Sequence, residues 1–143
     1  MSSKVENEMS CFSLYACGKE VVRRHKDFLD PLDLTYTQYI TMAVLWDRRE
    51  ITVKELGERL QLDSGTLTPL LKRLETKGYI TRRRSSDDER NLIVECTDAG
   101  MELRSKTSDI PEKIKCQFGL SSEECDQLGQ LLGKLHNNIR KRN

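Results

Sequence analysis

The chain has 143 residues, of which 36% are hydrophobic and 33% charged, a balance that fits one globular domain with a sizeable core. Its 24 basic and 23 acidic residues leave a net charge of +1. This near-neutral charge excludes attraction of nucleic acid by the chain as a whole, so a nucleic-acid partner would need a local basic patch.

The N-terminus and the cysteines indicate the compartment. No basic start precedes an apolar core there, and the chain has no run of about 18 apolar residues, so we expect neither a secretion signal nor a membrane partner. The cysteines are odd in number and form no CxxC pair, which predicts reduced thiols in a cytoplasmic protein. They are Cys11, Cys17, Cys96, Cys116 and Cys125.

The first expected helix, from about residue 5 to residue 28, is apolar on more than one side. Phe12 and Ala16 belong to one stripe, whereas Leu14 and Val22 belong to another. This pattern predicts a helix packed between two surfaces, one of which can belong to a second subunit.

After a break at Asp30-Pro31, two capping boxes predict the next two helices. The segments TYTQ at 35–38 and TVKE at 52–55 have the form S/T-x-x-E/Q, in which side chains satisfy the first free backbone N–H groups of a helix. Residues 61–64 then form a tight turn before a further helix. Two short helices joined in this way predict a helix-turn-helix.

The helix after this turn lies within 63–78, DSGTLTPLLKRLETKG, has one apolar stripe and is expected to end at a left-handed cap on Gly78. The stripe recurs at i, i+3, i+4 and i+7 as Leu67, Leu70, Leu71 and Leu74. The opposite face is small near its start and cationic further along, with Gly65, Thr68, Pro69, Lys72, Arg73 and Thr76. This order is typical of a helix that enters a DNA major groove, although an ordinary surface helix also fits the stretch taken alone. Pro69 is expected to remove at most one backbone hydrogen bond.

Residues 79–84 and 91–96 are β-prone and flank the polar loop 85–90, which predicts a β-hairpin wing. Basic side chains concentrate in the helix and the wing, as Lys72, Arg73, Lys77, Arg82, Arg83, Arg84 and Arg90. They predict a cationic face that can bind DNA, with Asp88 orienting Arg90 into a minor groove by a charge-assisted hydrogen bond. A solvated hairpin is the alternative interpretation of the wing charges.

The C-terminal part is expected to be helical again. Thr97 is a predicted N-cap, Pro111 a predicted interruption, and SSEE at 121–124 a third capping box. The segment that follows has an apolar seam at alternating spacings of three and four residues, which predicts packing against a partner helix. The seam consists of Cys125, Leu128, Leu132, Leu135 and Ile139.

The predicted fold is mainly α with a small β-hairpin wing. Residues 35–97 would form a winged helix-turn-helix region, and 1–34 and 98–143 the dimerisation helices of a single-domain chain. A two-fold dimer would place two recognition helices about 34 Å apart on a pseudo-palindromic operator in double-stranded DNA.

The segments DSGTLTPLLKRLETKGYITRRRS and DDERNLIVECTDAG resemble the MarR family of winged-helix transcription regulators. MSCFSLYACGKE and DLTYTQYITMAVLW are similar to its OhrR subgroup, which senses organic hydroperoxides through an N-terminal cysteine. The resemblance implies DNA contacts from Ser64, Thr66, Thr68, Lys72, Arg73 and Arg90, to which the wing adds Arg82, Arg84 and Asp88. It also implies that Cys11 is the redox-sensing cysteine, supported by Tyr15 and Tyr36, while His25 stands where the subgroup often has a third tyrosine.

The residues single out Cys11 independently. Tyr15 lies at i+4 on the same helical face, where its hydroxyl can stabilise a reactive thiolate. Oxidation would give a sulfenic acid that a second thiol converts to a disulfide. Members of the subgroup with a resolving cysteine in the partner's C-terminal half imply Cys116, with Cys125 as second choice. The alternative is that all five cysteines are buried small hydrophobes.

These observations predict a redox-responsive repressor that releases its operator when Cys11 is oxidised by an organic hydroperoxide, and neither a cofactor nor a metal. A regulator released by a small phenolic ligand is the alternative. A thiol peroxidase is a weaker one, because no arginine-assisted thiolate site is evident. A zinc regulator is weaker still, since the cysteines and histidines show no ligand spacing.

Overall fold

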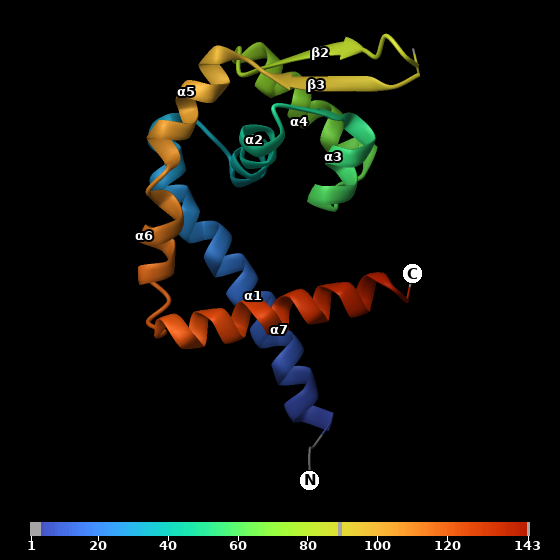
Figure 1. Ribbon diagram of the computed structural model, residues 1–143. Coiled ribbons are helices and arrows are strands. Elements are labelled where there is room, and N and C mark those ends of the chain that lie inside the picture. The colour runs from blue at the N-terminus through green and yellow to red at the C-terminus, as the bar shows by residue number, and fades with distance from the viewer. Residues whose placement is uncertain (1–3, 89, 143) are drawn as a thin grey trace. The chain divides into compact units, whose positions relative to one another are not determined.

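The computed structural model describes residues 4–88 and 90–142 and is mostly helical, with a small antiparallel sheet (Figure 1). The chain divides into two compact units, Met1–Ser108 and Asp109–Asn143. This architecture confirms the prediction of a mainly α fold with a small wing. The expected division of the chain into reading and dimerisation regions stays a prediction.

The first unit contains the winged helix and the long N-terminal helix. Its elements are α1 (Lys4–Leu29), the short 3-10 turn η1 (Asp30–Leu32), α2 (Tyr36–Arg48), β1 (Glu50–Thr52), α3 (Val53–Leu60), α4 (Ser64–Thr76), β2 (Ile80–Arg84), β3 (Leu92–Cys96) and α5 (Asp98–Thr107). The N-terminal half of α1 extends away from α2, α3 and α4 (Figure 1).

The wing is a three-stranded sheet with the order β1-β3-β2, not a hairpin alone. Both pairs are antiparallel, and Val94 in the central strand faces Ile51 in β1 and Arg82 in β2. Sequence reasoning missed β1 because three residues are too few to show the alternation of a strand. Arg49, at the end of α2, adopts a left-handed φ of 64°, which turns the chain back into the sheet.

The core of the first unit gathers around α2. Met42 and Leu45 of this helix are completely buried, as is Val94 of the sheet. The indole Nε1 of Trp46 donates a hydrogen bond of 2.8 Å to the carbonyl oxygen of Gly100. These contacts hold the sheet and the start of α5 on α2, so the helices that flank α2 rest on a rigid support.

The predicted helix starts are confirmed with one difference. Thr35 and Ser121 form complete capping boxes with the residues three positions later. Thr52 accepts the backbone N–H of Glu55 at 3.1 Å, which is one half of the third box. Each of these caps satisfies a backbone donor that a helix start otherwise leaves free.

The second unit contains α6 (Ile110–Cys116) and α7 (Ser122–Arg140). The interruption predicted at Pro111 is present, because α5 ends at Thr107 and Pro111 occupies the first turn of α6, where its missing N–H costs nothing. None of the residues of α7 is buried. Among the described residues, no helix is both long and apolar enough to span a membrane.

Candidate functional site

Helix α4 has one buried face and one exposed face. Leu67, Leu71 and Leu74 are at most 1% exposed, which confirms the leucine stripe. The predicted DNA-contacting residues of this helix are all exposed, namely Ser64, Thr66, Thr68, Lys72 and Arg73. The leucines therefore fix α4 on the core while its polar and cationic side faces solvent.

Both ends of α4 are defined by local chemistry. At the start, the carboxylate of Asp63 accepts the backbone N–H of Thr66 at 2.8 Å, and this bond lowers the pKa of Asp63. At the end, Gly78 adopts a φ of 82°, its N–H donates to the carbonyl of Glu75, and Tyr79 N–H donates to that of Leu74. This pair of bonds is a Schellman motif, so Gly78 is the left-handed cap that was predicted.

The turn between α3 and α4 depends on a close approach at Gly57. A Cβ at this position would lie 3.1 Å from the carbonyl oxygen of Leu62 and 3.4 Å from a methyl group of Leu67. The N–H of Leu62 closes the turn on the Gly57 carbonyl at 3.0 Å. The two helices therefore meet tightly, as the helix-turn-helix prediction requires.

The tip of the wing carries a supported arginine. Asp88 Oδ1 accepts the backbone N–H of Arg90 at 3.0 Å and its Nε–H at 3.2 Å. These bonds lower the pKa of Asp88, while the Arg90 side chain remains 90% exposed. Asp88 therefore holds Arg90 outward, which confirms the predicted contact between the two residues.

The other wing arginines differ from one another. Arg82 pairs with Glu75 of α4 at 3.1 Å and is largely covered, and this pair ties the wing to the helix. Arg83 pairs with Glu50 at 2.9 Å. Arg84 is exposed. Sequence reasoning treated Arg82 and Arg84 alike, because the partner of Arg82 becomes visible only when β2 is placed beside α4.

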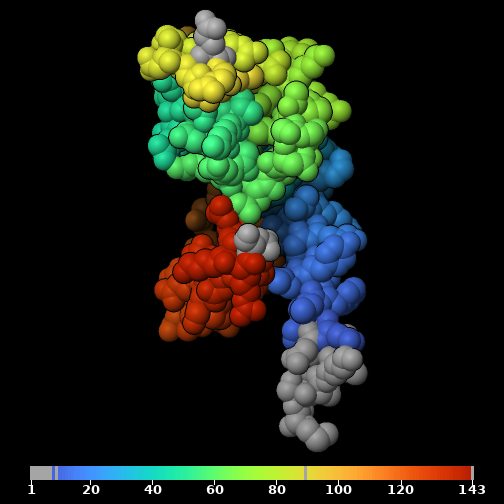
Figure 2. Space-filling view, turned by 90° about the vertical axis from the view of Figure 1, so that its right-hand side faces the viewer, coloured from blue at the N-terminus to red at the C-terminus, as the bar shows by residue number. Residues whose placement is uncertain are grey.

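The wing, α3 and α4 adjoin one another on one side of the first unit (Figure 2). The exposed residues of α4 and the tip of the wing are together called the reading surface below. Its cations are Lys72, Arg73, Arg84 and Arg90. A nearly neutral chain therefore has a local basic patch of the kind that a nucleic-acid partner needs.

Cys11 is exposed on α1 as a free thiol. Among the described residues, none forms a hydrogen bond with its sulfur, so the supporting roles of Tyr15 and Tyr36 stay predictions. Tyr15, one helical turn further, is 63% exposed, and the ammonium of Lys19 lies 5.3 Å from the centre of its ring. Cys11 and Tyr15 are thus both exposed on α1, within one turn of each other.

His25 lies in an aromatic cluster. Its side chain is buried, its Nδ1 lies 2.8 Å from the Val21 carbonyl oxygen, and its ring meets the Tyr36 ring edge-on at 4.8 Å. Fourteen residues separate it from Cys11, which is about 21 Å along a helix. His25 therefore cannot touch Cys11 of its own chain, and within the unit it packs α1 against α2.

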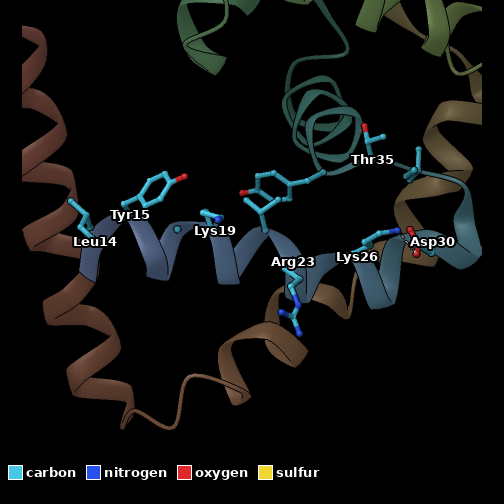
Figure 3. A pocket seen from close by; sticks show the side chains of 11 residues that line it. Leu14, Tyr15, Lys19, Arg23, Lys26, Asp30 and Thr35 are labelled. Carbon is cyan, nitrogen blue, oxygen red and sulfur yellow. Dashed lines mark hydrogen bonds and ion pairs between the residues drawn. The ribbon is translucent and has the colours of Figure 1, made fainter. Parts of the chain in front are cut away.

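An apolar groove begins at Leu14 and Tyr15, one turn after Cys11. It encloses about 750 Å³ between α1 and the start of α2. In Figure 3, Tyr15 stands on the α2 side of α1 and Lys26 reaches toward Asp30, with which it pairs at 2.7 Å. A groove of this size and polarity fits an organic molecule of drug-like dimensions.

The predicted resolving cysteines belong to the second unit. Cys116, at the end of α6, is exposed, and Cys125 in α7 is half-buried; both are free thiols. Within the described part of the chain, no group of three or more Cys, His, Asp or Glu side chains comes together as a metal site would require.

Comparison with known proteins identifies the family. A family model described as "Transcriptional regulator SarA/Rot" matches residues 24–107. The organic hydroperoxide resistance transcriptional regulator of Bacillus subtilis is 46% identical over 133 residues, 93% of this chain and 88% of that protein. The chain belongs to the MarR family of winged-helix transcriptional regulators.

Two solved MarR-type structures match nearly the whole chain. Reduced AbfR bound to DNA is 29% identical with a TM-score of 0.81, covering 94% of this chain and 92% of that one. AbfR, from Staphylococcus epidermidis, has also been solved in an overoxidised form on DNA and with a disulfide formed. A MarR variant from Escherichia coli with operator DNA is 26% identical at a TM-score of 0.81, covering 93% and 99% of the two chains.

Proposed function

We propose that this MarR-family chain forms a dimer that binds operator DNA when reduced and releases it when Cys11 is oxidised by an organic hydroperoxide. The observation that carries the proposal is the position of the exposed Cys11 one helical turn before an apolar groove of about 750 Å³. The groove can hold the organic part of a hydroperoxide while the peroxide group meets the sulfur. Relatives named for hydroperoxide resistance and for redox states on DNA support the same function.

The proposed oxidation needs only the thiols of the chain and the hydroperoxide. The Cys11 thiolate attacks one peroxide oxygen, the O–O bond breaks, and the departing alkoxide takes up a proton to become an alcohol. Cys11 is left as a sulfenic acid. A second thiol, for which Cys116 is the first candidate and Cys125 the second, can then displace water and form a disulfide.

DNA binding is proposed for the reading surface. Small hydroxyl side chains at the start of α4 would meet base edges, and Lys72 and Arg73 would meet phosphates. Arg90, held outward by Asp88, would enter the minor groove. Arg84 would add a phosphate contact from β2, whereas the pairing of Arg82 with Glu75 gives it the role of fixing the wing on α4.

Dimerisation is proposed because both units expose apolar surface. In α1, Phe12 is exposed and does not line the groove, and in α7 the predicted seam is exposed from Leu128 to Ile139. Exposed apolar side chains along a helix are typical of an interface. A dimer would cover these helices and carry two copies of α4 at the spacing of successive major grooves.

The test compares the wild-type protein with Cys11→Ser, using a DNA duplex that the wild-type protein has selected from a random pool. We expect stoichiometric cumene hydroperoxide to weaken binding of the wild-type protein about 100-fold, a difference of about 2.7 kcal/mol between the states, and to leave the variant unchanged. Loss of binding by peroxide-treated Cys11→Ser would exclude Cys11 as the sensor. Loss of binding with a phenolic acid but not with peroxide would favour the small-ligand alternative.

A further inference from the structure

Lys77, the C-cap residue that follows α4, is a cation whose side chain is mostly covered by other residues of the first unit. Its side chain is only 25% exposed, whereas Lys72 and Arg73 of the same helix face solvent. Its ammonium group donates to the backbone carbonyl oxygen of Asp33 and approaches the Asp33 carboxylate at 3.3 Å and the Gln38 side-chain oxygen at 3.4 Å. Three acceptors match the three N–H donors of a lysine.

The acceptors lie in the connection between α1 and α2, and the fold fixes their positions. Asp33 has a left-handed φ of 53°, and its own N–H donates to the Asp30 carbonyl at 3.0 Å. Asp30 in turn pairs with Lys26 in the last turn of α1 at 2.7 Å. Gln38 is buried, and its side-chain oxygen accepts the Thr35 N–H in the capping box of α2. Lys77 therefore contacts a segment whose position is fixed by both the end of α1 and the start of α2.

The space around this contact is open. A hollow of about 610 Å³ lies between the connection and α4, and its lining includes Asp33, Pro69, Arg73 and Lys77. Among the hydrogen bonds and ion pairs of residues 4–88 and 90–142, those of Lys77 alone join α4 to the segment 30–38. Lys77 thus adds a polar contact with this connection to the anchoring that the buried leucines and the Arg82–Glu75 pair give the end of α4.

We propose that Lys77 is a positioning residue through which α1 sets the orientation of α4, so that a displacement of α1 reaches the reading surface through this contact. The inference rests on the proposed function, because α1 carries Cys11. Lys77 does not contact DNA in this proposal. It keeps α4 in one orientation in the free protein, so that less conformational entropy is lost when DNA binds.

The experiment removes the ammonium group and keeps the aliphatic stem. Lys77→Met is compared with the wild-type protein, with Lys77→Arg as a conservative rescue, and with Lys106→Met as a charge-matched control on α5. Each protein is titrated with the selected duplex at several salt concentrations, first fully reduced and then after stoichiometric cumene hydroperoxide. Mass spectrometry measures the oxidation of Cys11, and thermal denaturation checks that each variant is folded.

We expect reduced Lys77→Met to bind about tenfold more weakly with an unchanged salt slope, because no phosphate contact is lost. We also expect the roughly 100-fold effect of oxidation to fall below about tenfold, although Cys11 oxidises to the same extent. Lys77→Arg should recover part of both effects, and Lys106→Met should behave as the wild-type protein does. If Lys77→Met does not fold, Asp33→Asn serves instead, since asparagine tolerates a left-handed φ, and it should show smaller changes in the same directions.

Wild-type affinity of Lys77→Met in both states would overturn the inference. So would a salt slope that falls by about 0.9 for each chain, because Lys77 would then be a phosphate contact. If the wild-type protein itself does not respond to peroxide, the proposed function fails. The affinity and salt slope of the reduced variant still decide whether Lys77 positions α4.

Discussion

The support of Arg90 by Asp88 leads to a quantitative prediction about the wing. Arg90→Ala removes one exposed cation from each chain, and each phosphate contact contributes about 0.9 to the salt slope, so a dimer should lose about 1.8. Between 50 and 200 mM salt the wild-type protein should then lose about 12-fold more affinity than the variant does. The loss at low salt should be about tenfold for each protomer, with little dependence on DNA sequence.

Asp88→Ala provides the matched comparison, because it keeps the arginine and removes the hydrogen bonds that the backbone N–H and the side chain of Arg90 donate to Asp88. Ordering a free arginine costs about 1 to 2 kcal/mol, so we expect operator affinity to fall about 5- to 30-fold for each protomer while the salt slope stays at its wild-type value. Arg104→Ala, on the exposed side of α5, controls for loss of charge.

The measurement is fluorescence anisotropy of a labelled duplex over a salt series. An Arg90→Ala protein with wild-type affinity and slope would refute a DNA contact by the wing tip. A reduced slope in Asp88→Ala would refute the orienting role of Asp88, since a variant that keeps its cation should release the same number of counterions.

Three further predictions concern buried residues of the first unit, Gly100, Cys96 and Tyr39. Gly100→Ala should cost about 3 kcal/mol or more in thermal denaturation, because its Cβ would lie 2.3 Å from the Tyr79 carbonyl oxygen. In native protein, iodoacetamide should modify exposed Cys11 quickly and Cys96 slowly, because burial raises the pKa of the Cys96 thiol; equal rates would contradict this. Burial also raises the pKa of Tyr39 above 10.0 in the folded protein. The contribution of the protonated Tyr39 side chain to the free energy of unfolding is therefore complete below pH 10 and is lost as the pH rises through the pKa of the folded state. Tyr39→Phe should therefore show a weaker fall in unfolding free energy above pH 10.

Local patterns predicted those parts of the site that depend on neighbours in sequence. The leucine stripe of α4 follows from helical periodicity, and the contact of Asp88 with Arg90 follows from a spacing of two residues. The cap at Gly78 follows from the freedom of glycine to adopt a positive φ.

Contacts between distant segments were beyond this reasoning. Strand β1 exists because β3 offers it a partner, although its three residues carry no pattern of their own. The pairing of Arg82 with Glu75 needs β2 and α4 side by side, and the bond from Lys77 to Asp33 spans 44 positions. Such contacts depend on tertiary packing, which overrides the average behaviour of each residue type.

The geometry of α1 limits how oxidation at Cys11 could act on α4. Cys11 lies 18 residues before Leu29, which is about 27 Å along a helix, so local rearrangement around the sulfur does not reach the winged helix directly. Met42 and Leu45 of α2 are completely buried and tolerate little movement. A displacement of α1 as a body can reach α4, because Lys26 in the last turn of α1 pairs with Asp30 in the connection that Lys77 contacts. Oxidation of Cys11 would therefore change the orientation of α4 by moving its C-terminal end. The leucines of its buried face would stay in place on the core.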